Sequence, residues 1–276
     1  MDGEKRIPPL SGGELPGGAD LPEELLRVFA YLPELYQDES EEQYIDALAL
    51  MMRSCYANRL YQFAYVQYHM LFMAAVYCAL LKTHLFHERE MENALYYLTK
   101  DRFHEFFGPN NTKDGKLYFG SFAAIGESEV FKLLRIVGMD ASLEGELKGF
   151  VKERNRYAHA NGRLLLTSDQ LFFEKIRRFN QKLEQVYGLL KEDVLALYQG
   201  LLRSPDFYDP EIRAYTDDGT QVQEELVRKY ALCPREVDWC RRCDIRRLEG
   251  EEGYPAMRRL HGALGLYARA GGSKAT

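Results

Sequence analysis

The run from Phe63 to Leu81, FAYVQYHMLFMAAVYCALL, constrains the fold of this chain more than any other segment. It is apolar on most sides of a helix, and it lies inside a longer helical pattern that spans 57–84. Gln67 and His69 interrupt it, so we interpret it as a buried central helix rather than a membrane span. A helix that is apolar nearly all round must be covered by other elements, which predicts a bundle.

Helical spacing continues on both sides of this segment, while runs of β-branched residues are scarce. The hydrophobic content of 46% is ordinary for a globular protein and provides for a packed core. We therefore predict an all-α bundle of five to seven helices with a small helical C-terminal extension. Besides the central segment, the spacing predicts helices over 21–32, 40–55, 84–107, 128–137, 142–159 and 168–202.

The last of these patterns is the longest, and it predicts one uninterrupted helix. Its apolar residues recur every three or four positions: Phe172, Ile176, Phe179, Leu183, Val186, Leu190, Val194 and Leu197. Pro205 and Pro210 then break the pattern. We expect a disordered, Gly- and Pro-rich tail over 1–20, a helical domain over 21–203 with a loop at 108–116, and a helical extension over 204–276.

Charge and cysteine content narrow the possible functions. The formal net charge of −6 and the pI near 5.7 argue against broad, non-specific duplex binding, which needs many phosphate contacts. A local basic cleft remains compatible with that charge. Five cysteines are an odd number, and the N-terminus lacks the apolar core of a signal peptide. These features predict a reducing, cytoplasmic setting with free thiols.

The stretch Arg154-Asn155-Arg156-Tyr157-Ala158-His159 carries the most chemistry in the chain. Asn155 and His159 are four residues apart, so they share one face of a helix. Arg154 and His159 are five apart, about 140° around the axis, so a straight helix does not stack them. The two can serve one site if the Arg154 side chain wraps round, if the helix ends near His159, or if two copies face each other.

This stretch resembles the Arg-x4-His signature of the HEPN superfamily, in its form with Asn directly after the Arg. The resemblance implies an all-α bundle and, in many members, a metal-independent endoribonuclease that acts as a homodimer with the motif at the interface. It also implies a role in defence or toxin-like RNA cleavage. Members paired with a nucleotidyltransferase antitoxin often carry Tyr two places after the motif His. Here Asn161 stands there, which disfavours that particular antitoxin-like partner.

RNA cleavage without a metal needs a base for the 2′-hydroxyl, a cation for the phosphorane and an acid for the leaving oxygen. His159 can carry the proton because an imidazole titrates near neutral pH. Arg154 presents a planar cationic fork to phosphate oxygens, and Asn155 can orient the imidazole. We expect no cofactor. The residues expected to bind RNA around these three are Lys148, Lys152, Arg156, Tyr157 and Arg163.

Alternatives remain open at this stage. The motif can also be a charged helix end in which Arg154 pairs with Glu153 or Glu144, and Tyr157 can equally be a core residue. The whole domain can be a non-catalytic dimerisation or RNA-binding module in a larger defence or regulatory complex. A zinc-stabilised interaction protein is a third possibility, with ligands from Cys233, Cys240, Cys243 and His261.

One further spacing resembles a set of metal ligands. His84 and His87 stand beside Glu88 and Glu90 at the start of a charged segment. We interpret this group as a solvated helix face, because His pairs in charged segments usually are.

Overall fold

A computed structural model describes residues 21–159 and 164–271. It confirms the all-α prediction: in this part of the chain the only β pairing is an isolated bridge between Lys113 and Lys116. The described α-helices are α1 Glu23–Leu26, α2 Glu39–Ala57, α3 Tyr61–Phe86, α4 Glu88–Thr99, α5 Phe103–Phe106, α6 Glu127–Val130, α7 Ala141–Ala158, α8 Asp169–Gly188, α9 Lys191–Arg203, α10 Pro205–Tyr208, α11 Asp218–Val222, α12 Pro234–Arg241 and α13 Tyr254–Gly271. Within 21–203, where five to seven were predicted, the described helices are α1 to α9, and α1, α5 and α6 are single turns.

Short 3₁₀ and π segments join several of these helices. They are Arg27–Tyr31, Lys100–Arg102, Phe119–Ala124, Phe131–Val137 and Ile245–Leu248, which are 3₁₀, and Gln223–Arg228, which is π-helical. The predicted tail over 1–20 lies outside the described residues.

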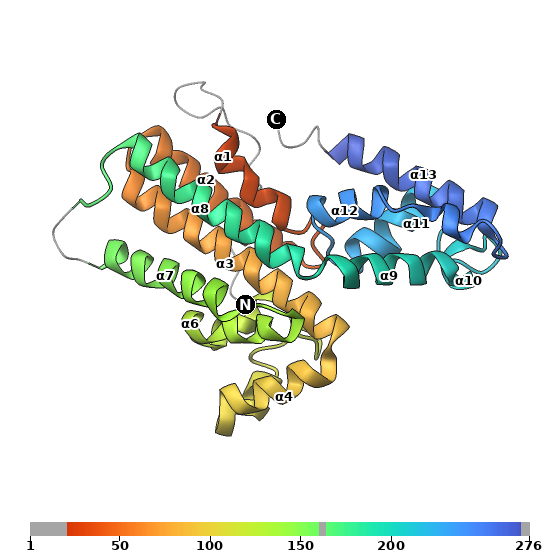
Figure 1. Cartoon of the computed structure of the whole chain (residues 1–276), viewed down its shortest axis with the longest axis horizontal. Helices are drawn as coiled ribbons and strands as arrows, with labels where there is room; N and C mark the ends of the chain where they lie inside the picture. The colour runs from red at the N-terminus through yellow and green to blue at the C-terminus, as the bar shows by residue number, and fades with distance from the viewer. Residues whose placement is uncertain (1–20, 160–163, 272–276) are drawn as a thin grey trace, which may run out of the picture.

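Helix α3 is the centre of the bundle, as predicted, and α2, α7 and α8 pack around it (Figure 1). Three fully or nearly fully buried phenylalanines mark the middle of this core. The ring of Phe179 on α8 lies 4.4 Å from that of Phe150 on α7 and 4.9 Å from that of Phe72 on α3. By length and composition α3 could cross a membrane, but 78% of its most apolar window is buried inside the fold. That burial is typical of a core helix in a soluble protein.

The predicted single helix over 168–202 is wrong, because the chain breaks between α8 and α9. Gly188 ends α8, and the carbonyls of Val186 and Tyr187 accept 3₁₀-type hydrogen bonds from Leu189 and Leu190. On α9 Val194 is buried as the spacing predicted, but Tyr198 is buried where Leu197 was expected, and Leu197 is only partly buried. Figure 1 shows α9 diverging from α8 toward the C-terminal helices.

The predicted helix over 84–107 is also divided, into α4, a 3₁₀ turn and α5. The loop predicted at 108–116 is confirmed, and it contains a tight turn at Asp114-Gly115. Both residues have positive φ, 49° and 75°, as in the type I′ turn that joins two paired strands. This geometry explains the isolated bridge between Lys113 and Lys116.

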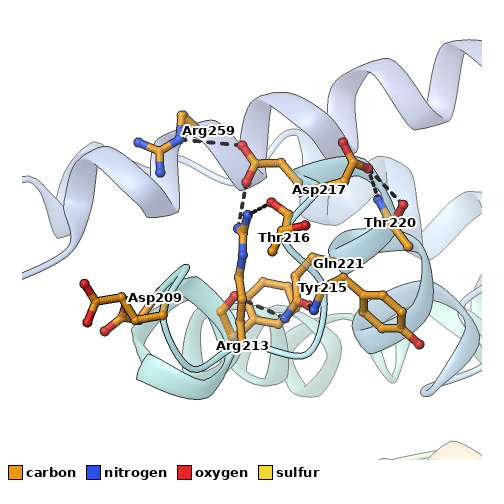
Figure 2. Close-up of polar contacts among 11 residues, drawn as sticks. Asp209, Arg213, Tyr215, Thr216, Asp217, Thr220, Gln221 and Arg259 are labelled. Carbon is orange, nitrogen blue, oxygen red and sulfur yellow. Dashed lines mark hydrogen bonds and ion pairs between the residues drawn. The ribbon is translucent and has the colours of Figure 1, made fainter.

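The segment after Ser204 folds as helices α10 to α13 and contacts α9. Its first loop is held by polar side chains rather than by a core (Figure 2). The guanidinium of Arg213, nine-tenths buried, donates to Asp218 at 2.6 Å and to the carbonyl of Thr216. Asp218 also lies 3.6 Å from Arg259 on α13. The domain boundary near Ser204 stays a prediction; α9, which precedes it, has its main helix contacts with α10 and α12, which follow it.

Candidate functional site

The predicted motif lies at the C-terminal end of α7. Asp140 caps the start of this helix by accepting a hydrogen bond from the backbone N–H of Leu143 at 2.7 Å. The helix ends at Ala158, and His159 follows with extended backbone angles of φ −74° and ψ 142°. The N–H of His159 still donates to the carbonyl of Asn155 at 3.1 Å. The chain therefore leaves the helix at His159, which is one of the three arrangements expected from the spacing.

Buried side chains of α3 fix this end of α7. Gln62 is 5% exposed, and its amide donates to the carbonyl of Tyr157 at 3.1 Å and accepts from the N–H of Leu165 at 2.7 Å. The hydroxyl of Tyr65 donates to Glu153 at 3.0 Å. One buried amide thus ties the helix end to the segment that leads into α8, so the position of the motif is set by the core.

Arg154 reaches a second element, the short helix α6. Its guanidinium forms a close ion pair with Glu127, and the same carboxylate oxygen lies 3.4 Å from Nε2 of His69 on α3. His69 is fully buried, whereas the side chains of Arg154 and Glu127 keep 25% and 28% of their surface exposed. The three side chains form a cluster, the Arg154–Glu127–His69 triad, that runs from the core to the surface.

The pKa shifts within this triad indicate its charge state. Burial lowers the pKa of His69, and the nearby Glu127 carboxylate only partly offsets that effect, so the imidazole is neutral at pH 7. Burial raises the pKa of Glu127, but hydrogen bonds from His69 and Arg154 outweigh it and hold the pKa below 4.5. An ionised carboxylate only accepts hydrogen bonds, so Nε2 of His69 carries the proton. Nδ1 of His69 and Nε of Arg154 are buried without a partner among the described residues.

The other predicted site residues differ in their exposure. Asn155 is half-buried, and His159, Lys152 and Arg156 are exposed. Lys148 is 2.5 Å from Glu144 one helical turn earlier, so part of its charge is compensated. Arg163 lies outside the described residues, as does Asn161.

Two expectations about this helix need correction. Tyr157 is 7% exposed and packs edge-on against Tyr65, with ring centroids 4.9 Å apart, so its ring is a core element that cannot stack on a base. Arg154 pairs with neither Glu153 nor Glu144. Glu153 instead contacts Lys175 of α8, and Glu144 pairs with Arg135 at 2.6 Å and with Lys148.

Sequence reasoning missed Glu127 as the partner of Arg154, because 27 residues separate the two and no spacing rule connects them. His69 offered a weak signal, since a single histidine inside an apolar helix must find a polar partner or stay neutral. That signal identified an interruption of the central helix and not the carboxylate that His69 contacts.

The cysteines and histidine considered for zinc do not form a common site among the described residues. Cys233 and Cys240 are buried, and burial raises the pKa of both thiols. Cys243 accepts from Gln199 at 3.3 Å, and Nδ1 of His261 is 2.7 Å from the hydroxyl of Tyr198. Cys233 and Cys240 are therefore protonated core residues of the C-terminal helices.

The triad predicts a loss of stability on mild acidification. A histidine whose folded pKa lies below its unfolded value of about 6.5 binds more protons in the unfolded chain, so unfolding becomes easier as the pH falls below that value. One such group contributes at most about 1.4 kcal/mol per pH unit. We expect His69→Gln, which cannot titrate, to flatten the pH dependence of the unfolding free energy below pH 6.5 in chemical denaturation. His84 and His261 have lowered pKa values too, so the slope is reduced and not abolished. An unchanged slope would contradict a buried neutral His69.

Comparison of the chain with family models, curated proteins and solved structures finds no match in any of the three.

Proposed function

We propose that the protein is a metal-independent endoribonuclease of the HEPN type, which cleaves single-stranded RNA by attack of the 2′-hydroxyl on the adjacent phosphate. The products would carry 2′,3′-cyclic phosphate ends. The observation that carries the proposal is the end of α7, where Arg154, Asn155 and an exposed His159 follow one another as the helix stops.

The chemistry of these side chains supports the proposal. His159 stands at the surface, where its imidazole can exchange a proton with RNA. Asn155 is one helical turn earlier on the same face and can hold that imidazole or the phosphate. The guanidinium of Arg154 has five N–H donors, and its contact with Glu127 orients it while leaving donors for phosphate oxygens. Lys152 and Arg156 add positive charge beside them.

A second copy of the chain would complete the reaction. One motif supplies a single acid–base group, whereas base and acid are both required as the bond breaks. Two motifs facing each other across a twofold axis would supply both. The proposal therefore includes a homodimer. It also includes a cytoplasmic setting, a role in defence and a regulatory partner that restrains the activity.

One observation favours a second candidate, a non-catalytic dimerisation or RNA-binding module. Glu127 compensates the charge of Arg154 before any RNA arrives, in a protein whose net charge is already −6. A guanidinium that is fully committed to this carboxylate would be a structural residue and would not stabilise a transition state.

Cleavage of a labelled, mixed single-stranded RNA pool in EDTA tests the proposal. We expect the wild type to cut and to leave cyclic-phosphate ends, and Arg154→Ala to be inactive. Arg177→Ala is the matched control, because Arg177 is a 63% exposed surface arginine on α8 that lies 3.5 Å from Glu24. Cleavage that survives Arg154→Ala would show that the motif is not the active site. A folded wild-type dimer that binds RNA without cutting it would favour the second candidate.

Glu127 is expected to act as a positioning residue for Arg154. Glu127→Ala should lower kcat by about 10–100-fold, since a guanidinium that loses its fixed orientation no longer meets the phosphate in register. Glu127→Gln should retain more activity because its amide oxygen can still accept from Arg154. KM should change little or fall, since a negative charge beside the RNA is removed. Glu129→Gln, an exposed carboxylate on the same helix, serves as the control. The positioning role would be contradicted if Glu127→Ala and Glu127→Gln lowered kcat equally while Arg154 kept its orientation in both variants.

A further inference from the structure

A second cluster of chemically active side chains lies where α3 meets α4, away from the motif. His84 is in the last turn of α3, the backbone changes direction at His87 (φ −135°, ψ 51°), and α4 begins at Glu88. One ring nitrogen of His84 and one carboxylate oxygen each from Glu88 and Glu92 lie within 4.8 Å of one another. Glu88 and Glu92 are four apart on α4, so the helix itself holds both on the face that meets His84.

These three side chains lack the partners that a purely structural cluster would have. Neither Glu88 nor Glu92 forms an ion pair with a Lys or Arg of the described chain, although like charges at this spacing repel each other. Nε2 of His84 is buried with no hydrogen-bond partner, on a ring whose centroid is 6.5 Å from that of Phe107. Burial also lowers the pKa of His84, so the imidazole is neutral and keeps a lone pair available.

His87, at the same bend of the chain, has the kind of partner that His84 lacks. Its Nε2 lies 2.9 Å from the carboxylate of Asp193 on α9, so this histidine is satisfied by the protein. The sequence-based prediction placed both histidines in one set with Glu88 and Glu90. The structure separates them and brings in Glu92, which revises the interpretation of His84 as part of a solvated face.

We propose that His84, Glu88 and Glu92 bind one divalent transition-metal ion, with Zn²⁺ as the best match. One imidazole nitrogen and two carboxylate oxygens are ligands that such ions accept, whereas Mg²⁺ and Ca²⁺ prefer oxygen alone. The ligand atoms of a tetrahedral zinc site are about 3.3 Å apart, given bond lengths of about 2.0 Å. Both glutamates are exposed, so small rotations of their side chains close the present spacing. Water completes the coordination.

The ion would act on the fold and not on the RNA chemistry. It would link the end of α3 to α4, which projects from one end of the bundle (Figure 1). The metal site is far from the Arg154–Glu127–His69 triad, because His84 lies fifteen residues after His69 on α3, about 22 Å along the helix axis. Metal binding at His84, Glu88 and Glu92 is independent of the proposed ribonuclease activity.

Isothermal titration of the full chain with ZnCl₂, in a reducing buffer without chelators, tests the site. We expect one Zn²⁺ per chain, and affinity at least about 100-fold weaker in Glu88→Gln/Glu92→Gln and in His84→Ala. Glu90→Gln, on the same helix, and His104→Ala, an exposed histidine on α5, should bind as the wild type does. The double glutamine variant changes only exposed side chains, so it separates loss of the site from loss of the fold, which circular dichroism monitors.

Cobalt gives an independent measurement. Co²⁺ should produce visible absorption bands with the wild type and with His104→Ala, and none with His84→Ala. Zn²⁺ should raise the melting temperature of the wild type but not of the double variant. The proposal is overturned if the wild type binds no stoichiometric Zn²⁺, or if binding persists in the double variant.

Discussion

His159→Ala is expected to lower the single-turnover rate of RNA cleavage by about 10²–10⁴-fold, the range that loss of a general acid–base group produces. RNA binding should change by less than about threefold, since the cationic side chains beside the motif remain and phosphate contacts dominate affinity. The reason lies in the position of His159, which is exposed just beyond the end of α7 and contributes its backbone N–H to the helix. Alanine keeps that backbone bond.

The same position predicts that the fold survives the substitution. An exposed residue outside the helix is expected to change the unfolding free energy by no more than about 0.5 kcal/mol. Loss of cleavage with unchanged binding and stability would therefore assign the effect to chemistry. His104→Ala, another exposed histidine, is the control and should leave rate, binding and stability unchanged.

This experiment separates the two candidate functions. Under the ribonuclease proposal the wild type cuts and His159→Ala binds without cutting. Under the binding-module alternative neither protein cuts and both bind equally. A variant that cuts at the wild-type rate would remove His159 from the mechanism and leave Arg154 without an acid–base partner.

The core of this fold could be predicted from the sequence because burial follows helical spacing. Phe172, Ile176 and Phe179 are fully buried on α8, as their three- and four-residue intervals indicated. The interruption at Gly188 could not be predicted in the same way. Glycine in a helical pattern is tolerated at a cost of about 1 kcal/mol, and here contacts of α9 with α10 and α12 accompany the change in direction.

The candidate site, too, could be predicted only in part. The end of α7 near His159 was one of three arrangements that the spacing allowed, because local rules govern where helices stop. The partner of Arg154 was not accessible to such rules. Glu127 and His69 come from two other elements, and only the packing of α7 against both α6 and α3 brings them to the guanidinium.

A buried ion pair between α3 and α12 supplies the largest expected effect on stability. Nζ of Lys82 lies 2.7 Å from Glu236, and the two side chains are 3% and 0% exposed. Burial lowers the pKa of Lys82, but the Glu236 carboxylate outweighs it and keeps the pKa above its ordinary value, so the ammonium is charged. The same carboxylate caps α12 by accepting from the N–H of Cys233 at 2.9 Å.

Glu236→Ala is expected to lower the unfolding free energy by about 3–5 kcal/mol, because it leaves the Lys82 ammonium buried without a counter-charge. It also removes the cap of α12. Urea denaturation followed by circular dichroism measures the change. Glu184→Gln is the control. Glu184 pairs with Arg235, the residue before Glu236, and the Glu184 side chain is 62% exposed. An exposed ion pair contributes less than about 1 kcal/mol to the unfolding free energy.

The double variant Lys82→Met/Glu236→Gln distinguishes charge from packing. Methionine fills most of the volume of the lysine stem, and glutamine keeps an acceptor for the N–H of Cys233. If the loss in Glu236→Ala comes from an uncompensated buried charge, the double variant should recover most of the stability, since a buried pair and an apolar replacement are often equivalent. A double variant as unstable as Glu236→Ala would show instead that the ammonium and carboxylate are needed together to join the C-terminal helices to α3.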